Sequence, residues 1–314
     1  MFLPWIEKYR PQTIDDVLGH NENINTIKNL LKNNSLPHLL FYGSPGTGKT
    51  STIITLAKQI YGINVRLMTM KLDASDDRGI NSVREDIKSF AEKSNMFIQG
   101  VRLIILDEVD SMTFDAQFAL RRIIEKYSTL IRFCLICNYE NKIIPAIKSR
   151  CANFRFNNID NKYIICKLNL IAKNENITFD DNVLDTIAYL SRGDLRKAIN
   201  LFQILFMQTN HITVSLCYQT YNYPTQNEIK NIFLLLTDTN LDFCFTCTEI
   251  KNIITEYNYM LTTIIYELLL TIINTQDILI NSCDIIIELA KLEIMVFKSY
   301  SDIYISYLVS IFKK

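Results

Sequence analysis

One short segment of the chain limits its fold more than any other. Residues Gly43 to Thr50 read GSPGTGKT, which fits the pattern G-x-x-x-x-G-K-[ST]. The apolar run HLLFYG leads into this segment, and the helix-patterned run TSTIITLAKQIY leads out of it. A glycine-rich loop of this pattern between a strand and a helix binds phosphate groups. The segment therefore predicts a parallel sheet covered by helices, with a nucleotide site beside the loop.

The residue types of this loop suit a nucleoside triphosphate with Mg²⁺. Its glycines allow backbone N–H groups to curl around phosphate oxygens, and the helix that starts there adds the positive end of its dipole. Lys49 is expected to bridge the β- and γ-phosphates, and the Thr50 hydroxyl to ligate Mg²⁺. The alternative, an accidental glycine loop, is disfavoured by the flanking elements. The predicted cofactors are ATP and Mg²⁺, and the predicted loop contacts are Gly43, Ser44, Pro45, Gly46, Thr47, Gly48, Lys49, Thr50 and Ser51.

A second motif, LIILDEVD from Leu103 to Asp110, adds carboxylates to the site. Its four apolar residues predict a buried strand, whose carboxyl end is where open α/β sheets bind ligands. Asp107 is expected to hold Mg²⁺ through water, and Glu108 to orient and polarise the attacking water. We expect Asp110 to have a structural role in the loop before the next helix. The pair of motifs therefore predicts ATP hydrolysis in addition to binding.

The remaining pattern indicates several domains. From His38 to about Phe156, strand-like runs such as VRLMTMKLDA, RLIILDE, RFCLICN and NFRF alternate with helix-patterned segments. After about Asn157, helical patterns continue to Lys314, with breaks at SRGDLRKAI and at YNYPTQNEI. Asp194 is expected to cap the helix after the first break. The pattern predicts a parallel α/β domain followed by helical domains.

Composition excludes some classes of protein. Lys plus Arg and Asp plus Glu each number 33, so any contact with nucleic acid must depend on a local group of basic side chains. The start of the chain lacks the pattern of a secretory signal, and the most apolar stretches are interrupted too early to span a bilayer. We therefore expect an intracellular protein with no membrane contact. Two C-x-x-C spacings are interpreted as reduced cysteines and not as a zinc site. Cys134 and Cys137 lie in a predicted strand, where residues three apart face opposite sides, and Cys244 and Cys247 are followed by no second Cys or His pair.

The motifs taken in order resemble the small subunits of replication factor C, the clamp-loader family of the AAA+ class. The resemblance depends on WIEKYRP, LDASDDRGI, DAQFALRR, Asn138, SRC and GDLRKAIN, and covers about the first two-thirds of the chain. It implies an AAA+ nucleotide-binding domain at 1–157, with a parallel sheet and helices on both faces. An all-α lid at 158–220 and an all-α collar for oligomerisation at 221–314 would follow.

The resemblance also implies roles in the nucleotide site. Asn138 is similar to the sensor-1 residue that positions the water or the γ-phosphate, and Arg196 to the sensor-2 residue of the lid. Arg150, in SRC, resembles the arginine finger that acts in trans on the ATP of a neighbouring subunit. The wall of the adenine pocket is assigned by the same resemblance to Tyr9, Arg10, Pro11 and Val17.

Outside the nucleotide site, Arg78, Arg84 and Lys142 match basic positions that track the DNA backbone in this family. Gln117 and Arg121 are similar to residues that link the DNA chamber to the catalytic acid. Residues 96–98, Met-Phe-Ile, are interpreted either as an edge facing the clamp or as core packing. Lys71 and Asp73 depart from the family pattern, and neither is expected to touch the nucleotide.

The function implied is an ATP-dependent clamp-loader small subunit. In a ring that is expected to be pentameric, with other clamp-loader subunits, it would open a sliding clamp and load it onto primer-template DNA. The alternatives are a scaffold subunit that binds nucleotide without turnover, and another AAA+ DNA motor. The expected compartment is the nucleus, or a cytoplasmic replication factory if the source is a large DNA virus.

Overall fold

The computed structural model describes residues 3–33, 35–74, 79–92, 100–209, 211–238, 240–274, 282–298 and 301–313, with side chains from 85 to 91 in the third range and from 283 in the seventh. The chain divides into two compact units, Met1–Asn210 and His211–Lys314. The two units are described separately below. Within the described ranges, no helix combines the length and hydropathy that crossing a membrane requires.

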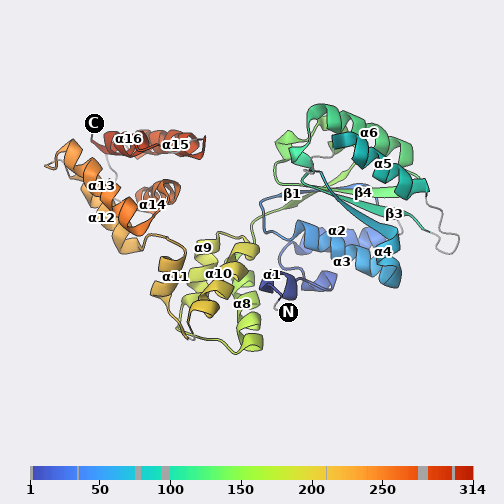
Figure 1. Cartoon of the computed structure of the whole chain (residues 1–314), viewed down its shortest axis with the longest axis horizontal. Coiled ribbons are helices and arrows are strands. Elements are labelled where there is room, and N and C mark those ends of the chain that lie inside the picture. Colours follow the sequence, from blue (N-terminus) through green and yellow to red (C-terminus); the bar gives the residue numbers. More distant parts are fainter. Residues whose placement is uncertain are drawn as a thin grey trace. The chain divides into compact units, whose positions relative to one another are not determined.

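A five-stranded sheet forms the centre of the first unit (Figure 1). Its strand order is β2-β3-β4-β1-β5, and every pairing is parallel. The parallel register brings the carboxyl ends of the strands to one edge, where Asp73 lies opposite Asp107 and Gly43 opposite Phe156. The strands are β1 (Leu39–Gly43), β2 (Thr69–Asp73), β3 (Arg102–Asp107), β4 (Ile131–Cys137) and β5 (Ala152–Phe156).

Helices cover both faces of this sheet, as predicted. Figure 1 shows α2 (Asn21–Lys32) and α3 (Lys49–Tyr61) on one face, with α5 (Gly79–Glu92) and α6 (Phe114–Tyr127) on the other. Alternate residues of β1, β3 and β4 enter separate hydrophobic cores on the two faces, as the two-residue period of a strand requires. Cys134 belongs to one core and Cys137 to the other, so this C-x-x-C pair faces opposite ways.

One predicted strand is only partly a strand. The run VRLMTMKLDA was expected to be extended throughout, but Val65–Met68 forms the short helix α4 and the strand begins at Thr69. Met68 is buried while Leu67 is exposed. A short apolar run does not reveal from periodicity alone whether it is helical or extended. The remaining short elements of the sheet domain are η1 (Ile14–Asp16), η2 (Gly62–Asn64), η3 (Val109–Ser111), η4 (Glu140–Lys142) and α7 (Pro145–Lys148).

Three longer helices complete the first unit: α8 (Asn161–Glu175), α9 (Val183–Ser191) and α10 (Leu195–Gln208). The N-terminal helix α1 (Trp5–Lys8) packs against α10. Asp194 caps α10 as expected, because its carboxylate accepts hydrogen bonds from Arg196 N and Lys197 N at 2.9 and 3.1 Å. Such a cap contributes about 1 kcal/mol to helix stability. It also fixes where the helix that carries Arg196 begins.

The second unit is a helical domain with its own hydrophobic core. The break at Pro224 lies between α11 (Val214–Thr220) and α12 (Gln226–Thr237), and Thr225 and Glu228 form a capping box at the start of α12. The other helices are α13 (Phe243–Tyr257), α14 (Leu261–Asn274), α15 (Ser282–Lys298) and α16 (Ile303–Phe312). Two short strands interrupt the expected helical pattern of the second half: β6 (Thr178–Phe179) in the first unit and β7 (His211–Ile212) in the second.

Candidate active site

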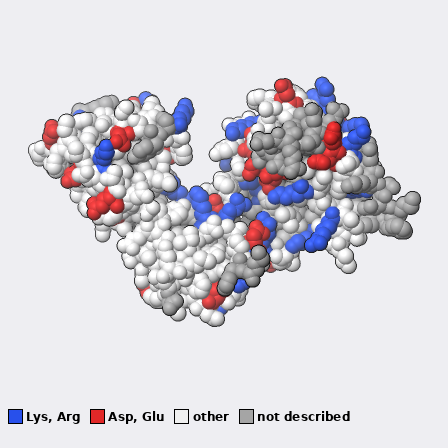
Figure 2. All heavy atoms as spheres, viewed as in Figure 1, with Lys and Arg blue, Asp and Glu red and all other residues white. Residues whose placement is uncertain are grey.

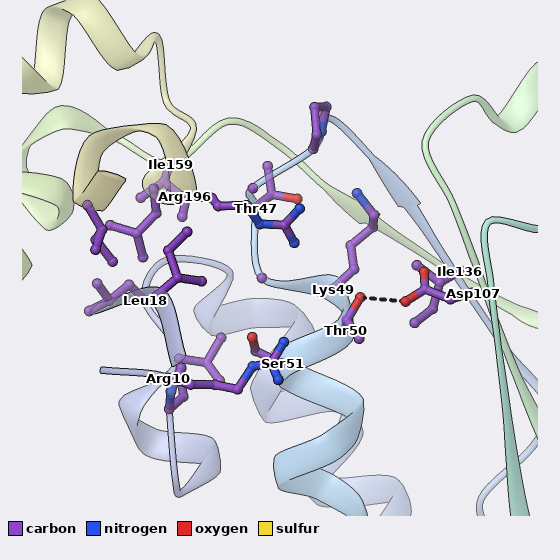
Figure 3. A pocket seen from close by; sticks show the side chains of 18 of the residues that line it. Arg10, Leu18, Thr47, Lys49, Thr50, Ser51, Asp107, Ile136, Ile159 and Arg196 are labelled. Carbon is purple, nitrogen blue, oxygen red and sulfur yellow. Dashed lines mark hydrogen bonds between the residues drawn. The ribbon is translucent and has the colours of Figure 1, made fainter. Parts of the chain in front are cut away.

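A pocket of about 290 Å³ lies at the carboxyl edge of the sheet, between the glycine-rich loop, the N-terminal segment and the helices α8 and α10. Figure 3 shows its labelled side chains converging from the sheet, from α3 and from α10. Most predicted site residues line it: Tyr9, Arg10, Pro11, Val17, Pro45, Gly46, Thr47, Gly48, Lys49, Thr50, Ser51, Asp107, Glu108, Asn138 and Arg196. Residues from distant parts of the sequence therefore form one site.

The glycines of the loop are required by close backbone approaches. A Cβ at Gly43 would lie 2.0 Å from the carbonyl oxygen of Phe156 on the neighbouring strand. A Cβ at Gly46 would lie 1.7 Å from Asp194 Oδ1, and the φ of Gly46 is +70°. Side chains are excluded from both positions by these distances and by the positive φ. The loop therefore keeps a bare backbone facing the pocket, which is the form that cradles a phosphate group.

Three hydrogen bonds to the surrounding chain hold the Lys49 side chain over this loop. Its Nζ donates hydrogen bonds to the carbonyl oxygens of Gly43 and Ser44 at 2.7 and 2.8 Å, and to Asn138 Oδ1 at 3.1 Å. Burial lowers the pKa of Lys49 from its usual value, and nearby groups including Asp107 act in the opposite direction. A partly desolvated ammonium group is prepared to pair with phosphate oxygens, because it has already lost part of its hydration shell.

Oxygen ligands suited to Mg²⁺ lie next to Lys49. Thr50 Oγ1 donates to Asp107 Oδ2 at 3.1 Å, which brings a hydroxyl and a carboxylate to one point at the edge of the sheet (Figure 3). Hard oxygen donors beside a phosphate site are the type of ligand that Mg²⁺ prefers. These residues fit the predicted metal, and Thr50 and Asp107 would hold it.

Glu108 follows Asp107 in a left-handed conformation, with a φ of 55°. This conformation is uncommon for a residue with a side chain. The Glu108 backbone N–H donates to Asp107 Oδ1 at 3.2 Å, and the Ser111 hydroxyl donates to the Glu108 carbonyl oxygen at 2.7 Å. Asp107 accepts the hydrogen bond of Thr50, and Glu108 also lines the pocket.

Asn138 is positioned by Asp110, whose Oδ2 accepts hydrogen bonds from the backbone N–H groups of Asn138 and Tyr139 at 3.3 and 3.2 Å. The expected structural role of Asp110 thus extends to fixing the end of β4. The buried side chain of Gln117 on α6 fixes the segment that follows. Its Nε2 donates to the carbonyl oxygens of Met112 and Lys142, and its Oε1 accepts from Ile144 N at 2.9 Å.

Three charged side chains that line the pocket were missed by the sequence analysis. Lys71 and Asp73, which are not expected to touch the nucleotide, also line the pocket, because β2 ends beside β3 in the parallel register. Lys71 Nζ lies 3.3 Å from Asp107 Oδ2. Lys167, on α8, also lines the pocket, and burial lowers its pKa. The helical pattern of residues 161–175 carried no signal that could have identified Lys167.

Other predicted residues do not line the pocket. Arg150 is half-exposed, and its Nη2 and Nε lie 2.6 and 2.8 Å from Glu125 Oε1. The same Glu125 oxygen is 3.3 Å from Arg121 Nε. Lys142 is exposed, with its Nζ 5.0 Å from the centre of the Tyr139 ring. Gly43 and Ser44 contribute through the carbonyl groups that hold Lys49.

The remaining predictions fall outside the described parts of the chain: Arg78, the side chain of Arg84, and residues 96–98. On the face drawn in Figure 2, basic and acidic side chains are interspersed over the part of the first unit that holds the sheet. This agrees with equal numbers of basic and acidic residues in the sequence. A nucleic-acid contact on this face would thus depend on a small local group of cations.

Comparison with known families matches both parts of the first unit. The model of the ATPase family associated with various cellular activities (AAA) matches residues 39–158, and that of the RCF1/5-like AAA+ ATPase lid domain matches residues 167–207. Among solved structures, the Thermotoga maritima RuvB Holliday junction branch migration motor is similar with a TM-score of 0.55. The match covers 77% of this chain and 85% of the RuvB chain. Because the two sequences are only 14% identical, this similarity shows the fold alone.

Curated relatives are much closer in sequence. Replication factor C subunit 3 of Schizosaccharomyces pombe is 45% identical over 251 residues, which are 80% of this chain and 73% of that protein. Replication factor C subunit 5 of Arabidopsis thaliana is 41% identical over 303 residues, which are 92% of this chain and 81% of that protein. The chain therefore belongs to the replication factor C small-subunit family, the AAA+ ATPases of the DNA-replication clamp loader.

Proposed function

We propose that this chain binds ATP with Mg²⁺ in the pocket described above and hydrolyses it as one member of a ring of clamp-loader subunits. One observation carries the proposal. Lys49, Asn138 and Arg196 line a single pocket together with the carboxylates of Asp107 and Glu108, whereas Arg150 points to Glu125 elsewhere on the surface. In this proposal the pocket supplies the residues that bind the nucleotide and activate the attacking water, and a neighbouring subunit supplies the arginine finger.

Each residue of the pocket has a distinct task in this proposal. The loop N–H groups and Lys49 bind the phosphates, and Thr50 and Asp107 hold Mg²⁺, which neutralises charge on the phosphate oxygens. Glu108 orients and polarises the attacking water, while Asn138 positions that water or the γ-phosphate. Arg196 reaches toward the loop beside Thr47 from α10, so the helical part of the unit responds to the nucleotide (Figure 3).

The nucleotide cycle would drive clamp loading. ATP binding orders the ring so that it grips and opens a sliding clamp, primer-template DNA enters, and hydrolysis at the subunit interfaces releases the loaded clamp. Each step uses a difference in affinity between two conformations. The helices of 221–314 would form the collar of the ring. Arg78, Arg84 and Lys142 would contact the DNA backbone, through contacts that are independent of sequence and sensitive to salt.

Glu108→Gln tests turnover by this subunit. The amide cannot accept a proton from the attacking water, so the ATPase rate of this site in the co-purified complex should fall at least about 100-fold. Affinity for ATP should stay within about twofold, because Lys49 and the loop are unchanged. The assay measures ATPase activity with and without clamp and primed DNA. An unchanged rate would favour the alternative of a scaffold subunit without its own turnover.

Arg150→Ala tests the action in trans. The isolated chain should bind ATP as before, because Arg150 does not line its own pocket. Hydrolysis in the assembled ring should fall by about 1000-fold at the neighbouring site, as for other arginine fingers. Turnover should be measured in a ring in which only this subunit carries the substitution. Normal turnover in such a ring would refute the assignment.

A further inference from the structure

The N-terminal segment is attached to the helical part of the first unit. The Trp5 side chain is buried, and its ring centre lies 5.8 Å from that of Phe202 and 5.4 Å from that of Phe206. The Trp5 backbone N–H donates to Gln203 Oε1 at 2.9 Å. All three partners belong to α10, the helix that also carries Arg196.

Glu175 makes a second attachment, at the end of α8. Its Oε1 accepts hydrogen bonds from Lys8 Nζ and from the Tyr9 hydroxyl, both at 2.5 Å. The Glu175 side chain is only 17% exposed and does not line the pocket, whereas Tyr9 does. Glu175 therefore holds the pocket wall from behind.

The charges of this contact favour a fixed geometry. The hydrogen bond from Lys8, followed by that from Tyr9, lowers the pKa of Glu175, so the carboxylate stays ionised at neutral pH. Burial, followed by the Glu175 hydrogen bond, raises the pKa of Tyr9, so the phenol keeps its proton and remains a donor. A hydrogen bond to an ionised acceptor is about twice as strong as one between neutral groups.

We propose that Glu175 is a positioning residue for nucleotide binding, which fixes Tyr9 to the lid so that the wall beside the base and Arg196 move as one body. This inference rests on the proposed assignment of the pocket to ATP. Two independent helices, α8 and α10, anchor the same short segment. Closure of these helices on the phosphates would thereby also close the wall on the base.

Two ligands distinguish what the pocket wall contributes to binding from what the phosphate loop contributes. The affinities of the full-length chain for ATP and for inorganic tripolyphosphate would be measured by titration calorimetry with Mg²⁺. Glu175→Ala should weaken ATP binding about tenfold, because Tyr9 loses its charged acceptor, and should leave tripolyphosphate binding within about twofold. Tyr9→Phe should act in the same direction. The double variant should bind ATP no more weakly than Glu175→Ala, because the Tyr9–Glu175 contact that Tyr9→Phe removes is already lost in Glu175→Ala.

Two further variants serve as controls. Glu175→Gln keeps an acceptor oxygen for Tyr9 and should recover most of the ATP affinity. Lys173→Ala removes a charge from the same turn of α8 and should bind both ligands as the natural chain does. Trp5 is the only tryptophan of the chain, so an unchanged emission spectrum in each variant confirms that the segment and α10 remain packed.

The outcomes discriminate between two kinds of failure. If the natural chain binds ATP no more tightly than tripolyphosphate, the base adds no affinity. The proposed ATP site is then wrong, and the inference fails with it. If the natural chain binds ATP tightly and Glu175→Ala binds it equally well, only the positioning role is overturned. Equal losses for ATP and tripolyphosphate would also overturn it, because Glu175 would then support the pocket as a whole.

Discussion

Two half-buried histidines lie in the sheet domain. His38 stands just before β1, and its Nδ1 accepts a hydrogen bond from the backbone N–H of Phe133 in β4 at 3.1 Å. Burial lowers the pKa of His38, and the positive charge of Arg132 adds to this effect. His20, whose ring centre lies 4.7 Å from that of Phe156, also has a pKa lowered by burial. Both rings are therefore neutral in the folded chain at neutral pH.

The first prediction concerns stability against acid. Because the pKa of His38 is lower in the folded chain than the ordinary value of about 6.5, the unfolded chain binds its proton more readily. The contribution of the neutral His38 ring to the free energy of unfolding is complete above pH 6.5 and is lost as the pH falls below it. The reason is that a protonated Nδ1 cannot accept the hydrogen bond from Phe133 N. His38→Asn keeps an acceptor that does not titrate. In urea unfolding at pH 7.5 and 5.5, this variant should lose less stability on acidification than the natural chain; an equal loss would contradict the prediction.

Contact between two elements controls the shape of the phosphate loop. Gly46 lies against Asp194, the residue that caps α10, so the loop and the start of the lid helix share one small space. Arg196 follows two residues later and lines the pocket. A change in the loop is therefore transmitted to the lid helix through the Asp194 carboxylate, which contacts the loop and caps the helix.

The second prediction compares two glycines with the same φ. Gly46 and Gly19 both have a φ of +70°, but a Cβ at Gly19 would meet nothing within 4 Å. Both substitutions by alanine share the cost of a positive φ, about 1 kcal/mol. Gly46→Ala adds a clash with Asp194, so it should reduce the free energy of unfolding by at least about 1 kcal/mol more than Gly19→Ala. Urea unfolding of both variants measures the difference, and equal losses would show that Asp194 moves aside freely.

At the scale of the molecule, the chain consists of two units with separate hydrophobic cores. The core of the second unit is formed by residues between Ile229 and Phe312, and the cores that flank the sheet by residues of the first unit. The pocket is lined entirely by residues of the first unit. A ligand that binds only the folded pocket stabilises the unit that contains it.

The third prediction is that the two units respond differently to nucleotide. Scanning calorimetry of the full chain should show two transitions, because separate cores can unfold separately. A non-hydrolysable ATP analogue with Mg²⁺, at about 100 times its dissociation constant, should stabilise the transition of the first unit by about 2.7 kcal/mol. The transition of the second unit should not move. A single transition that shifts as a whole would contradict this.

Much of the first unit could be predicted from the sequence because its signals are local. The loop from Gly43 to Thr50 and the carboxylates of Asp107 and Glu108 have fixed spacing to a strand or a helix, and these neighbouring elements formed as expected. The cap at Asp194 also depends on nearby residues, and it is confirmed.

The remaining features depend on contacts between distant segments. Lys71 and Lys167 enter the pocket because of strand register and helix packing, and their own surroundings in the sequence contain no sign of this. The helix at Val65–Met68 was missed because four residues are too few to show a helical period. The attachment of Tyr9 to Glu175 joins positions 166 residues apart, which no local motif could reveal.

The buried amide of Gln117 limits how the sheet domain can deform. Each of its polar atoms is bonded to backbone, on one side at Met112 and on the other at Lys142 and Ile144. Any displacement of η4 must therefore turn α6 with it, or leave buried backbone groups without hydrogen bonds. The loop after Asn138 and the helix that carries Arg121 are thus coupled directly through the hydrogen bonds of Gln117.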